Sequence, residues 1–304
     1  MNRDKNVYRA KLGALLALLV LLTACEGIMD WSGKRKDPIF QTAEAKTLLD
    51  YWDDFDFRYR AMMLTPEKLE QKLVDYMALF PTVPDTVLQE GISEMLSEAA
   101  TDSLSLNYFL KEYDHYLYDP NSPMRNETYY AHILSHISQD SSLAEDIRIK
   151  HATLLQMVRK NQVGEVATDF TFLGIDGKQH KMHEGTRTYK IVLFYDPTCS
   201  HCAAMIQDLA MTPQLEACIQ NDYLDMLAIS LLPDKDKWLR YQQQIPKSWV
   251  NGWDEDAAVI NQGLYNIQAY PTIYLLDSEN KVVLKDAPFD LTMRTLAKMA
   301  NRGM

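Results

Sequence analysis

Two hydrophobic patterns divide this chain, one before and one after residue 161. Between residues 42 and 161 the apolar residues recur every three or four positions, as they do along one face of an α-helix. Thr65-Pro66-Glu67 is a typical helix start, because Thr caps the first turn, Pro fits the first helical position and an acid suits the N-terminus. Helices are expected from there to residue 80 and over residues 86–100, 103–118, 127–137 and 143–161. With almost no glycine in this region, the pattern predicts an all-α bundle over residues 41–161.

After residue 161 strands alternate with helices. Asp176-Gly177 marks a hairpin turn within residues 169–183, and residues 189–195 (YKIVLFY) are an apolar run suited to a buried central strand. Further strands are expected over residues 224–231, 248–251, 273–277 and 281–285, and helices over residues 199–218, 235–244, 256–264 and 290–301. This order predicts an α/β domain over residues 162–304, with a central mixed sheet and flanking helices.

The first 25 residues have the pattern of a targeting segment. Basic residues precede an apolar run of 11 residues at 12–22, which is too short to span a bilayer but has the length of a signal-peptide core. The run ends in Leu22-Thr23-Ala24-Cys25, which resembles the lipoprotein box of bacteria, where the cysteine is lipidated and becomes the first residue. The resemblance implies a lipoprotein signal peptide over residues 1–24, a lipid anchor at Cys25 and a polar tether over residues 25–40. An ordinary cleaved signal with a chance cysteine is the alternative.

Composition and charge limit the classes of function. Of the 304 residues, 47% are apolar and 24% are charged, which is the composition of a packed globular protein. The formal net charge is −11 and no basic patch stands out, so no nucleic-acid partner is expected. The cysteines Cys25, Cys199, Cys202 and Cys218 are too few for a small disulfide-stabilised scaffold.

The chemistry is expected at Cys199-Ser200-His201-Cys202. This motif stands where the apolar run at 189–195 gives way to a helical stretch, so Cys199 is expected near a helix N-terminus. Unpaired N–H groups and the helix dipole favour an anion there, and the thiolate is the nucleophile of disulfide exchange. Cys202, one turn later, is placed to attack a mixed disulfide and to release the partner. The spacing suits a reversible redox disulfide.

The second half of the chain resembles the thioredoxin superfamily, in the branch with TlpA-like and AhpC/TSA-like proteins of bacterial envelopes. The residues that carry the resemblance are Gly164, Ala167, Asp169, Phe170, the strand at 191–195, Cys199, Cys202, Tyr270-Pro271-Thr272 and the strand that ends at Leu276-Asp277. In that superfamily the proline is cis and lies beside the redox disulfide. The resemblance therefore gives this role to Pro271, with Tyr270 offering its backbone to an extended substrate. Together with the lipobox and the helical region, the whole chain resembles thioredoxin-like lipoproteins of Bacteroidetes.

The resemblance implies a membrane-anchored thiol–disulfide oxidoreductase of the cell envelope, with its domains in the periplasm. Its partners would be cysteine-containing envelope proteins and a membrane electron donor or acceptor, with no metal or organic cofactor. Thr198 replaces the aromatic residue usual before the first cysteine, and Leu193 replaces the buried acid of thioredoxin, which removes that proton acceptor. His201 is expected to stabilise the Cys199 thiolate and to make the couple more oxidising than thioredoxin at about −270 mV.

Other interpretations of the cysteines are weaker. A peroxiredoxin needs Thr three residues and Pro seven residues before its reactive cysteine, where this chain has Asp196 and Val192. A c-type haem site needs His after the second cysteine, where Ala203 stands, and a structural zinc site needs two further ligands. Cys218 is expected to be a small buried apolar residue near the end of the active-site helix. A non-catalytic binding module on a thioredoxin-like scaffold remains the alternative.

Two features of the helical region have structural explanations. His132 and His136 have the spacing of metal ligands on a helix, but Ile133 stands where a zinc protease needs Glu. In residues 51–57 (YWDDFDF) acids alternate with aromatic residues, and we expect the rings in the core and the acids in water.

Overall fold

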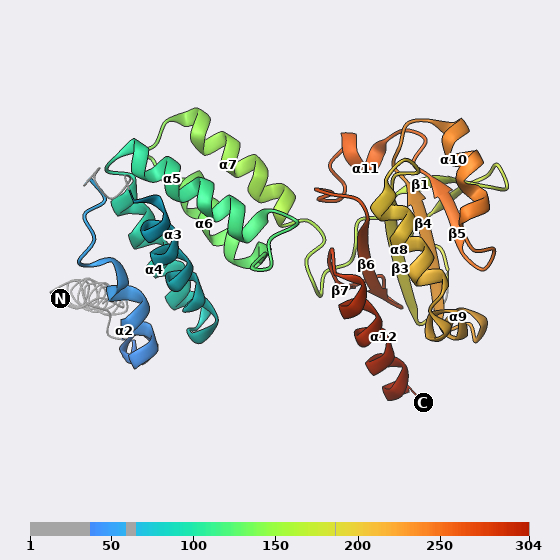
Figure 1. The fold of residues 1–304 in the computed structure, drawn as a ribbon, viewed down its shortest axis with the longest axis horizontal. Helices are drawn as coiled ribbons and strands as arrows, with labels where there is room; N and C mark the ends of the chain where they lie inside the picture. Colours follow the sequence, from blue (N-terminus) through green and yellow to red (C-terminus); the bar gives the residue numbers. More distant parts are fainter. Residues whose placement is uncertain (1–36, 59–64, 186, 304) are drawn as a thin grey trace, which may run out of the picture. The chain divides into compact units, whose positions relative to one another are not determined.

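A computed structural model describes residues 37–58, 65–185 and 187–303. The proposed signal peptide, Cys25 and most of the tether lie outside these residues. The chain forms two compact units (Figure 1): one comprises the residues up to Tyr118 and Thr128–Leu143, and the other comprises Asp119–Glu127 and the residues from Ala144. Within the described residues, no helix is both long and apolar enough to cross a bilayer.

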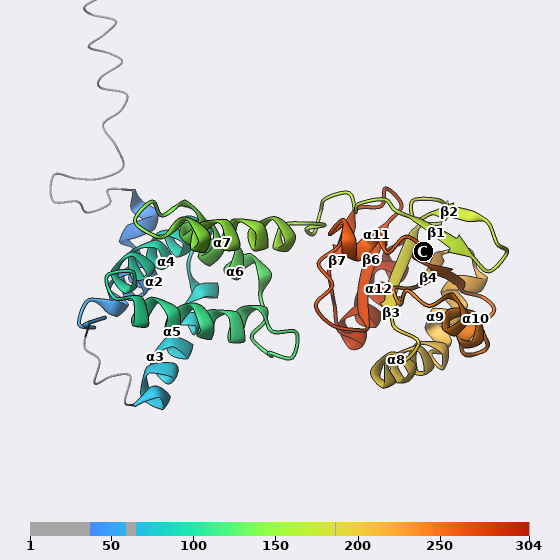
Figure 2. The same cartoon turned by 90° about the horizontal axis from the view of Figure 1, so that it is seen from above.

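The first unit is helical, which confirms the predicted all-α region (Figure 2). Its main helices are α2 (Ala43–Leu49), α3 (Pro66–Ala78), α4 (Asp85–Ala99), α5 (Ser103–Tyr113) and α6 (Glu127–Gln139). The helix expected over residues 103–118 keeps α-helical geometry only to Tyr113, and Asp114–Tyr118 form a π-helical turn. Pro38–Gln41, at the end of the expected tether, already form a 3₁₀ turn with Phe40 buried.

Aromatic rings form the centre of the helical unit. Trp52 and Phe57 are buried while Asp53, Asp54 and Asp56 are exposed, as the alternating pattern predicted. The Trp52 ring meets that of Phe109 with centroids 5.4 Å apart in an edge-to-face arrangement, a favourable geometry for aromatic pairs.

The two histidines of α6 have separate polar partners. Nε2 of His132 lies 2.7 Å from a carboxylate oxygen of Asp85, and Nε2 of His136 lies 3.5 Å from the hydroxyl of Ser97. Burial lowers the pKa of His136. These contacts agree with the structural role expected for the pair.

Helix α7 (Glu145–Val158) and residues 119–127 form part of the second compact unit, although their sequence pattern is that of the helical region. A buried ion cluster explains this. Arg125 pairs with Asp286 and Glu127, and Nζ of Lys285 lies 2.7 Å from a carboxylate oxygen of Glu127. Lys285 Nζ also donates to the carbonyl of Val158 at 2.7 Å, so one side chain joins the end of α7 to the sheet domain. Breaking such a buried pair is costly, since a charge is left unpaired.

The rest of the second unit is an α/β domain with a mixed seven-stranded sheet, as predicted. The strands are β1 (Thr171–Gly174), β2 (Gln179–Lys181), β3 (Tyr189–Tyr195), β4 (Leu224–Ser230), β5 (Val250–Trp253), β6 (Thr272–Asp277) and β7 (Val282–Leu284), in the spatial order β2-β1-β5-β4-β3-β6-β7. Strands β3, β4 and β5 are parallel, and β6 runs antiparallel to β3. The helices are α8 (Ser200–Ala210), α9 (Pro213–Gln220), α10 (Lys235–Tyr241), α11 (Ala258–Asn261) and α12 (Phe289–Gly303).

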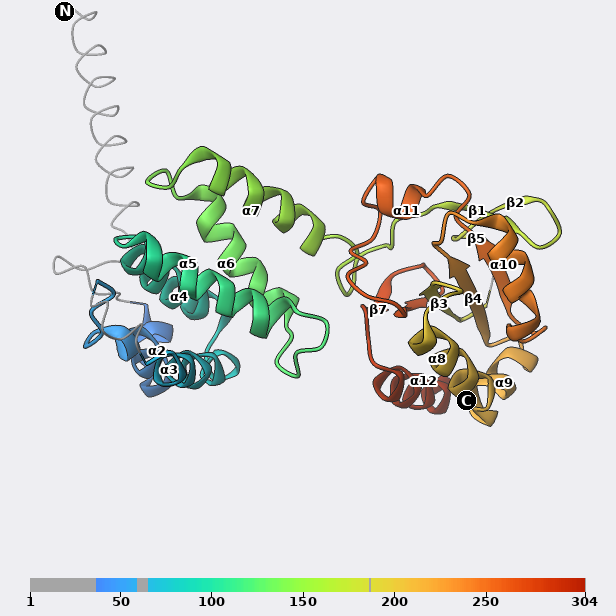
Figure 3. The same cartoon turned by 45° about the horizontal axis from the view of Figure 1, so that its top comes forward.

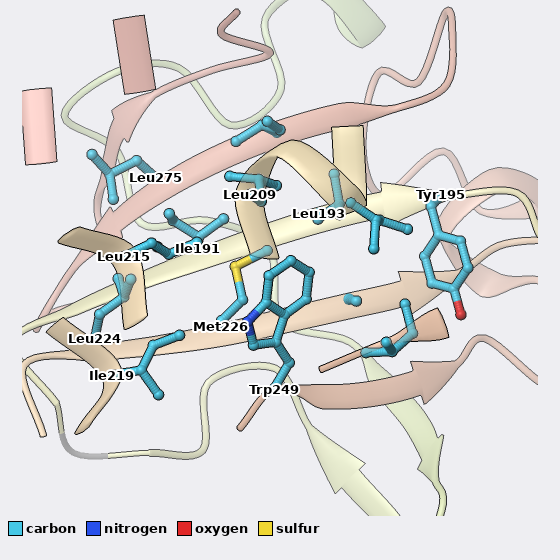
Figure 4. Packing of buried hydrophobic residues seen from close by; sticks show 14 of the residues in the cluster. Ile191, Leu193, Tyr195, Leu209, Leu215, Ile219, Leu224, Met226, Trp249 and Leu275 are labelled. Carbon is cyan, nitrogen blue, oxygen red and sulfur yellow. The ribbon is translucent and has the colours of Figure 1, made fainter. Parts of the chain in front are cut away.

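Each face of the sheet has its own core. Ile191, Leu193 and Tyr195 of β3 point to the face that α8, α9 and α12 cover, whereas Val192 and Phe194 point to the face that carries α11 (Figure 3). On the first face, Leu209 of α8 and Leu215 and Ile219 of α9 pack with the β3 and β4 side chains, as Figure 4 shows. Both faces of β3 are therefore apolar, which explains why its sequence is a continuous hydrophobic run.

The single helix expected over residues 199–218 is in fact two helices, α8 and α9. Pro213 has no N–H to continue the first helix and occupies the first turn of the second. Cys218 therefore lies on α9 rather than on the active-site helix, and it is half-buried rather than buried. It packs against the α8 face of the core, and burial raises the pKa of its thiol.

Gly252 on β5 is a position where any side chain would disturb the core. A Cβ there would overlap the ring of Phe172 and lie 2.8 Å from Cδ1 of Ile229. We expect Gly252→Ala to lower the free energy of unfolding by about 1–3 kcal/mol, as overpacking of a tight core does. Urea unfolding followed by circular dichroism measures the change. Val250→Ala on the same strand is the control, since Val250 is exposed, and an equal loss in both variants would contradict the overpacking argument.

Candidate active site

The register between β3 and β6 brings together two loops that are distant in sequence. Phe194 of β3 pairs with Thr272 of β6, so the loop that follows β3 and the loop that precedes β6 meet at one edge of the sheet. The first loop carries Cys199, and the second carries Tyr270 and Pro271. The Cα register alone thus places the candidate residues side by side.

Cys199 is the N-cap residue of α8. Its backbone is extended, and its sulfur accepts a hydrogen bond from the N–H of Cys202 at 3.3 Å. Unpaired N–H groups at a helix start stabilise negative charge, so the helix offers the sulfur a favourable site for its thiolate form. The side chain is half-buried, which leaves the sulfur accessible.

Cys202 has a different environment one turn later. It lies on α8 and is fully buried in the core between this helix and the sheet, and burial raises the pKa of its thiol to about 12, with a smaller contribution from the neighbouring Cys199. At neutral pH Cys202 therefore keeps its proton, whereas Cys199 is only half-buried. Both cysteines are free thiols in the structure, and the pair is asymmetric in exposure.

The Tyr270–Pro271 peptide bond is cis, and both residues are half-buried. The carbonyl oxygen of Tyr270 lies 3.7 Å from the sulfur of Cys199, within reach of the thiol proton. The structure thus brings together Cys199, Cys202, Tyr270 and Pro271.

His201 lies on the exposed first turn of α8, between the two cysteines. Within the part of the chain that the structure describes, its ring makes no hydrogen bond. Its effect on the thiolate would therefore be that of a solvated cation close in sequence, which is weaker than that of a buried one.

Asp196 occupies the turn between β3 and α8. Its carboxylate accepts hydrogen bonds from the backbone N–H and the hydroxyl of Thr198, at 2.6 and 2.7 Å, and its carbonyl accepts from the N–H of Cys199 at 3.1 Å. These bonds hold the turn that presents Cys199. Leu193 is buried among apolar side chains, so no acid occupies that position of the sheet.

Tyr241 of α10 is a neighbour of the cysteines that sequence reasoning missed. Its ring lies 5.5 Å from that of Tyr195, and burial raises the pKa of its hydroxyl, with further contributions from Cys202 and Cys199. The hydroxyl of Tyr195 donates to Asn251 at 2.8 Å, and the Trp238 indole N–H donates to the same oxygen at 3.2 Å. No motif marks these residues, because α10 follows β4 and reaches the site only through the sheet order.

Among residues 37–58, 65–185 and 187–303, no three His, Cys, Asp or Glu side chains are grouped to hold a metal ion.

Comparison with known proteins divides the chain near residue 161, where the sequence pattern also changes. Residues 44–161 match a family described as a domain of unknown function (DUF5106), and residues 177–287 match a family described as a thioredoxin-like domain. No curated protein matches the chain.

Solved structures give three further comparisons. A thioredoxin-like protein from Bacteroides caccae is 31% identical, with 84% of this chain and 92% of that one covered and a TM-score of 0.78. A conserved protein of unknown function from Bacteroides fragilis is 32% identical over 44% of this chain and 98% of that one, with a TM-score of 0.43. The thioredoxin domain of a thiol-disulfide oxidoreductase from Bacteroides vulgatus is 22% identical over 45% and 97% of the two chains, with a TM-score of 0.40.

The Bacteroides caccae protein matches over both units, at an identity and coverage that exceed what a shared fold alone requires. Since one family match covers the helical region and the other the α/β domain, the chain belongs to the thioredoxin-like proteins that carry a DUF5106 domain in front of the thioredoxin-like domain.

Proposed function

We propose that this protein is a membrane-anchored thiol–disulfide oxidoreductase that acts on cysteines of cell-envelope proteins. The observation that carries the proposal is the asymmetry of the pair: an accessible Cys199 sulfur at a helix N-terminus, backed by a buried and protonated Cys202. Disulfide exchange needs one exposed nucleophile and one resolving thiol, and this arrangement supplies both.

The reaction follows from the geometry. The Cys199 thiolate attacks one sulfur of a client disulfide, which breaks that bond, forms a mixed disulfide and releases the second client sulfur as a thiolate. Cys202 then gives up its proton and attacks the Cys199 sulfur, so the internal disulfide forms and the client leaves with both cysteines reduced. Two electrons pass from the protein to the client, and a membrane donor would return them. The reverse sequence oxidises the client and passes the electrons to a membrane acceptor.

Tyr270 and Pro271 would bind the client chain. The Tyr270 carbonyl oxygen lies 3.7 Å from the Cys199 sulfur, so an extended client segment that pairs with this backbone would bring its own sulfur to Cys199. A non-catalytic binding module would need the same surface but neither thiol.

Single-cysteine variants test the proposed roles. We expect Cys202→Ser to form a stable mixed disulfide with envelope clients, because the first attack proceeds and the resolving thiol is missing. Cys199→Ser should form none, since the buried Cys202 cannot reach a client. Non-reducing gel electrophoresis of acid-quenched cells, followed by mass spectrometry of the adducts, makes the comparison. Adducts in equal amount from both variants would contradict the assigned order of attack, and their absence from both would favour the binding module.

His201 should raise the reduction potential of the Cys199–Cys202 couple. A cation beside Cys199 stabilises the reduced form, so we expect a value above about −270 mV and below about −120 mV. His201→Gln should lower it by about 10–20 mV, as an exposed ionic contact of about 0.5–1 kcal/mol would do. Equilibration with glutathione buffers measures both values. Identical potentials for the two proteins would remove His201 from the mechanism.

The anchor at Cys25 is part of the proposal and rests on the lipobox. We expect the wild-type protein to partition into the detergent phase of Triton X-114, and Cys25→Ser to remain in the aqueous phase because it accepts no lipid. Cys218→Ser is the matched control, and it should partition like the wild type. If Cys25→Ser still partitions into detergent, the anchor lies elsewhere.

A further inference from the structure

A pocket lies beside the redox pair, on the side of α10. Its volume is about 370 Å³, and its walls come from the turn before Cys199, the first turns of α8 and the outer face of α10. The residues that carry the argument are Pro197, Thr198, Ala203, Lys237, Arg240 and Tyr241. The pocket is open to solvent and lies within the α/β unit.

The pocket is cationic in a protein that is acidic overall. Lys237 and Arg240 contribute positive charge, whereas the chain as a whole has a formal charge of −11. Lys237 already pairs with Asp234 at 3.4 Å, and Lys237 and Arg240 both help to lower the pKa of that carboxyl, after the backbone N–H of Lys237. Arg240 has no ion pair or hydrogen bond of its own within the described residues. Its guanidinium is therefore available to a ligand.

The pocket adjoins the attacking sulfur. Pro197 and Thr198 directly precede Cys199, and the Tyr241 ring is close enough to both cysteines for their charges to raise the pKa of its hydroxyl. An extended polypeptide advances about 3.3–3.6 Å per residue, so a client joined to Cys199 would pass the pocket within a few residues of its own cysteine.

We propose that this pocket is a subsite for an acidic side chain that flanks the reactive cysteine of the client, with Arg240 as the main carboxylate-binding residue and Lys237 as a second cation. The inference rests on the proposed oxidoreductase function and names the class of client: a protein disulfide with Asp or Glu near the cysteine. Arg suits this task because its planar guanidinium binds a carboxylate through two parallel hydrogen bonds.

Three synthetic peptides test the subsite. They share one sequence with a single cysteine, carry Glu, Gln or Lys at the positions that flank it, and are joined through that cysteine to 2-thiopyridine. Attack of Cys199 on the peptide sulfur releases 2-thiopyridone, and attack of Cys202 then frees the peptide thiol and closes the internal disulfide. The two electrons come from the protein dithiol, and its two protons end on the thiopyridone and the peptide thiol. The full-length reduced protein in detergent is used, and thiopyridone absorbance gives the rate.

The wild-type protein should react about 3–5-fold faster with the Glu peptide than with the Gln peptide, which is the effect of one exposed ion pair. Each rate is divided by the rate of the same peptide with dithiothreitol, so that the intrinsic reactivity of the disulfide cancels. Arg240→Gln should reduce this preference to about 1, and Lys237→Gln should reduce it less. The preference should also fall in 0.5 M salt, because the charges are exposed.

Lys235→Gln is the matched control. Lys235 lies on the same helix and carries the same charge, but it contacts the Trp253 ring and not the pocket. It should keep the wild-type preference. A wild type that reacts equally with all three peptides, or an equal loss of preference in Lys235→Gln and Arg240→Gln, would overturn the subsite. If instead the wild type releases thiopyridone no faster than Cys199→Ser, the proposed oxidoreductase function itself has failed.

Discussion

The antiparallel pairing of β3 with β6 is the constraint on which the candidate site depends. The register fixes Phe194 opposite Thr272, and this leaves the Cys199 turn and the Tyr270-Pro271 loop adjacent at the edge where β3 ends. Residues separated by 71 positions can then approach within 3.7 Å without any bond that is special to the site. Both faces of β3 are buried, so a slip of the register by one residue would exchange the two cores. The large packing energy of the sheet therefore holds a small and exposed site in place.

The two cysteines differ in how deeply they are buried. Cys199 caps α8 and is half-buried against the apolar core, whereas Cys202 in the first turn is fully buried within it, and this burial raises the pKa of the Cys202 thiol to about 12. The helix start stabilises negative charge at Cys199, and the core opposes it at Cys202. In the proposed reaction a protonated Cys202 would not compete with Cys199 for the client, and the order of the two attacks would follow from the orientation of the helix on the sheet.

Sequence patterns predicted the elements that follow from periodicity and turn residues, but they missed the helix break at Pro213 and the partners that tertiary structure supplies. The buried strand at 189–195, the hairpin around Asp176-Gly177 and the all-α region were predictable, since periodicity and turn residues determine them. The run of residues 199–218 looked like one helix because its apolar spacing continues through the break at Pro213. The sequence pattern also did not predict the role of Lys190 inside the apolar strand. Its Nζ donates hydrogen bonds to the carbonyl oxygens of Met182 and Glu184.

The dependence on tertiary structure also explains why sequence motifs identify only part of the candidate site. Cys199, Cys202, Tyr270 and Pro271 lie in short motifs, whereas Tyr241 and Arg240 lie on a helix without one. Their helix follows β4, which runs parallel to β3 and ends at the same edge, so its residues reach the cysteines through sheet order alone. The two cysteines and the two cations of the pocket therefore lie on different helices, α8 with its N-cap and α10. If the proposed subsite exists, substitutions on the outer face of α10 would change which client segment is favoured without disturbing the strand and helix that present Cys199, since loops and surface helices tolerate change that a core strand does not.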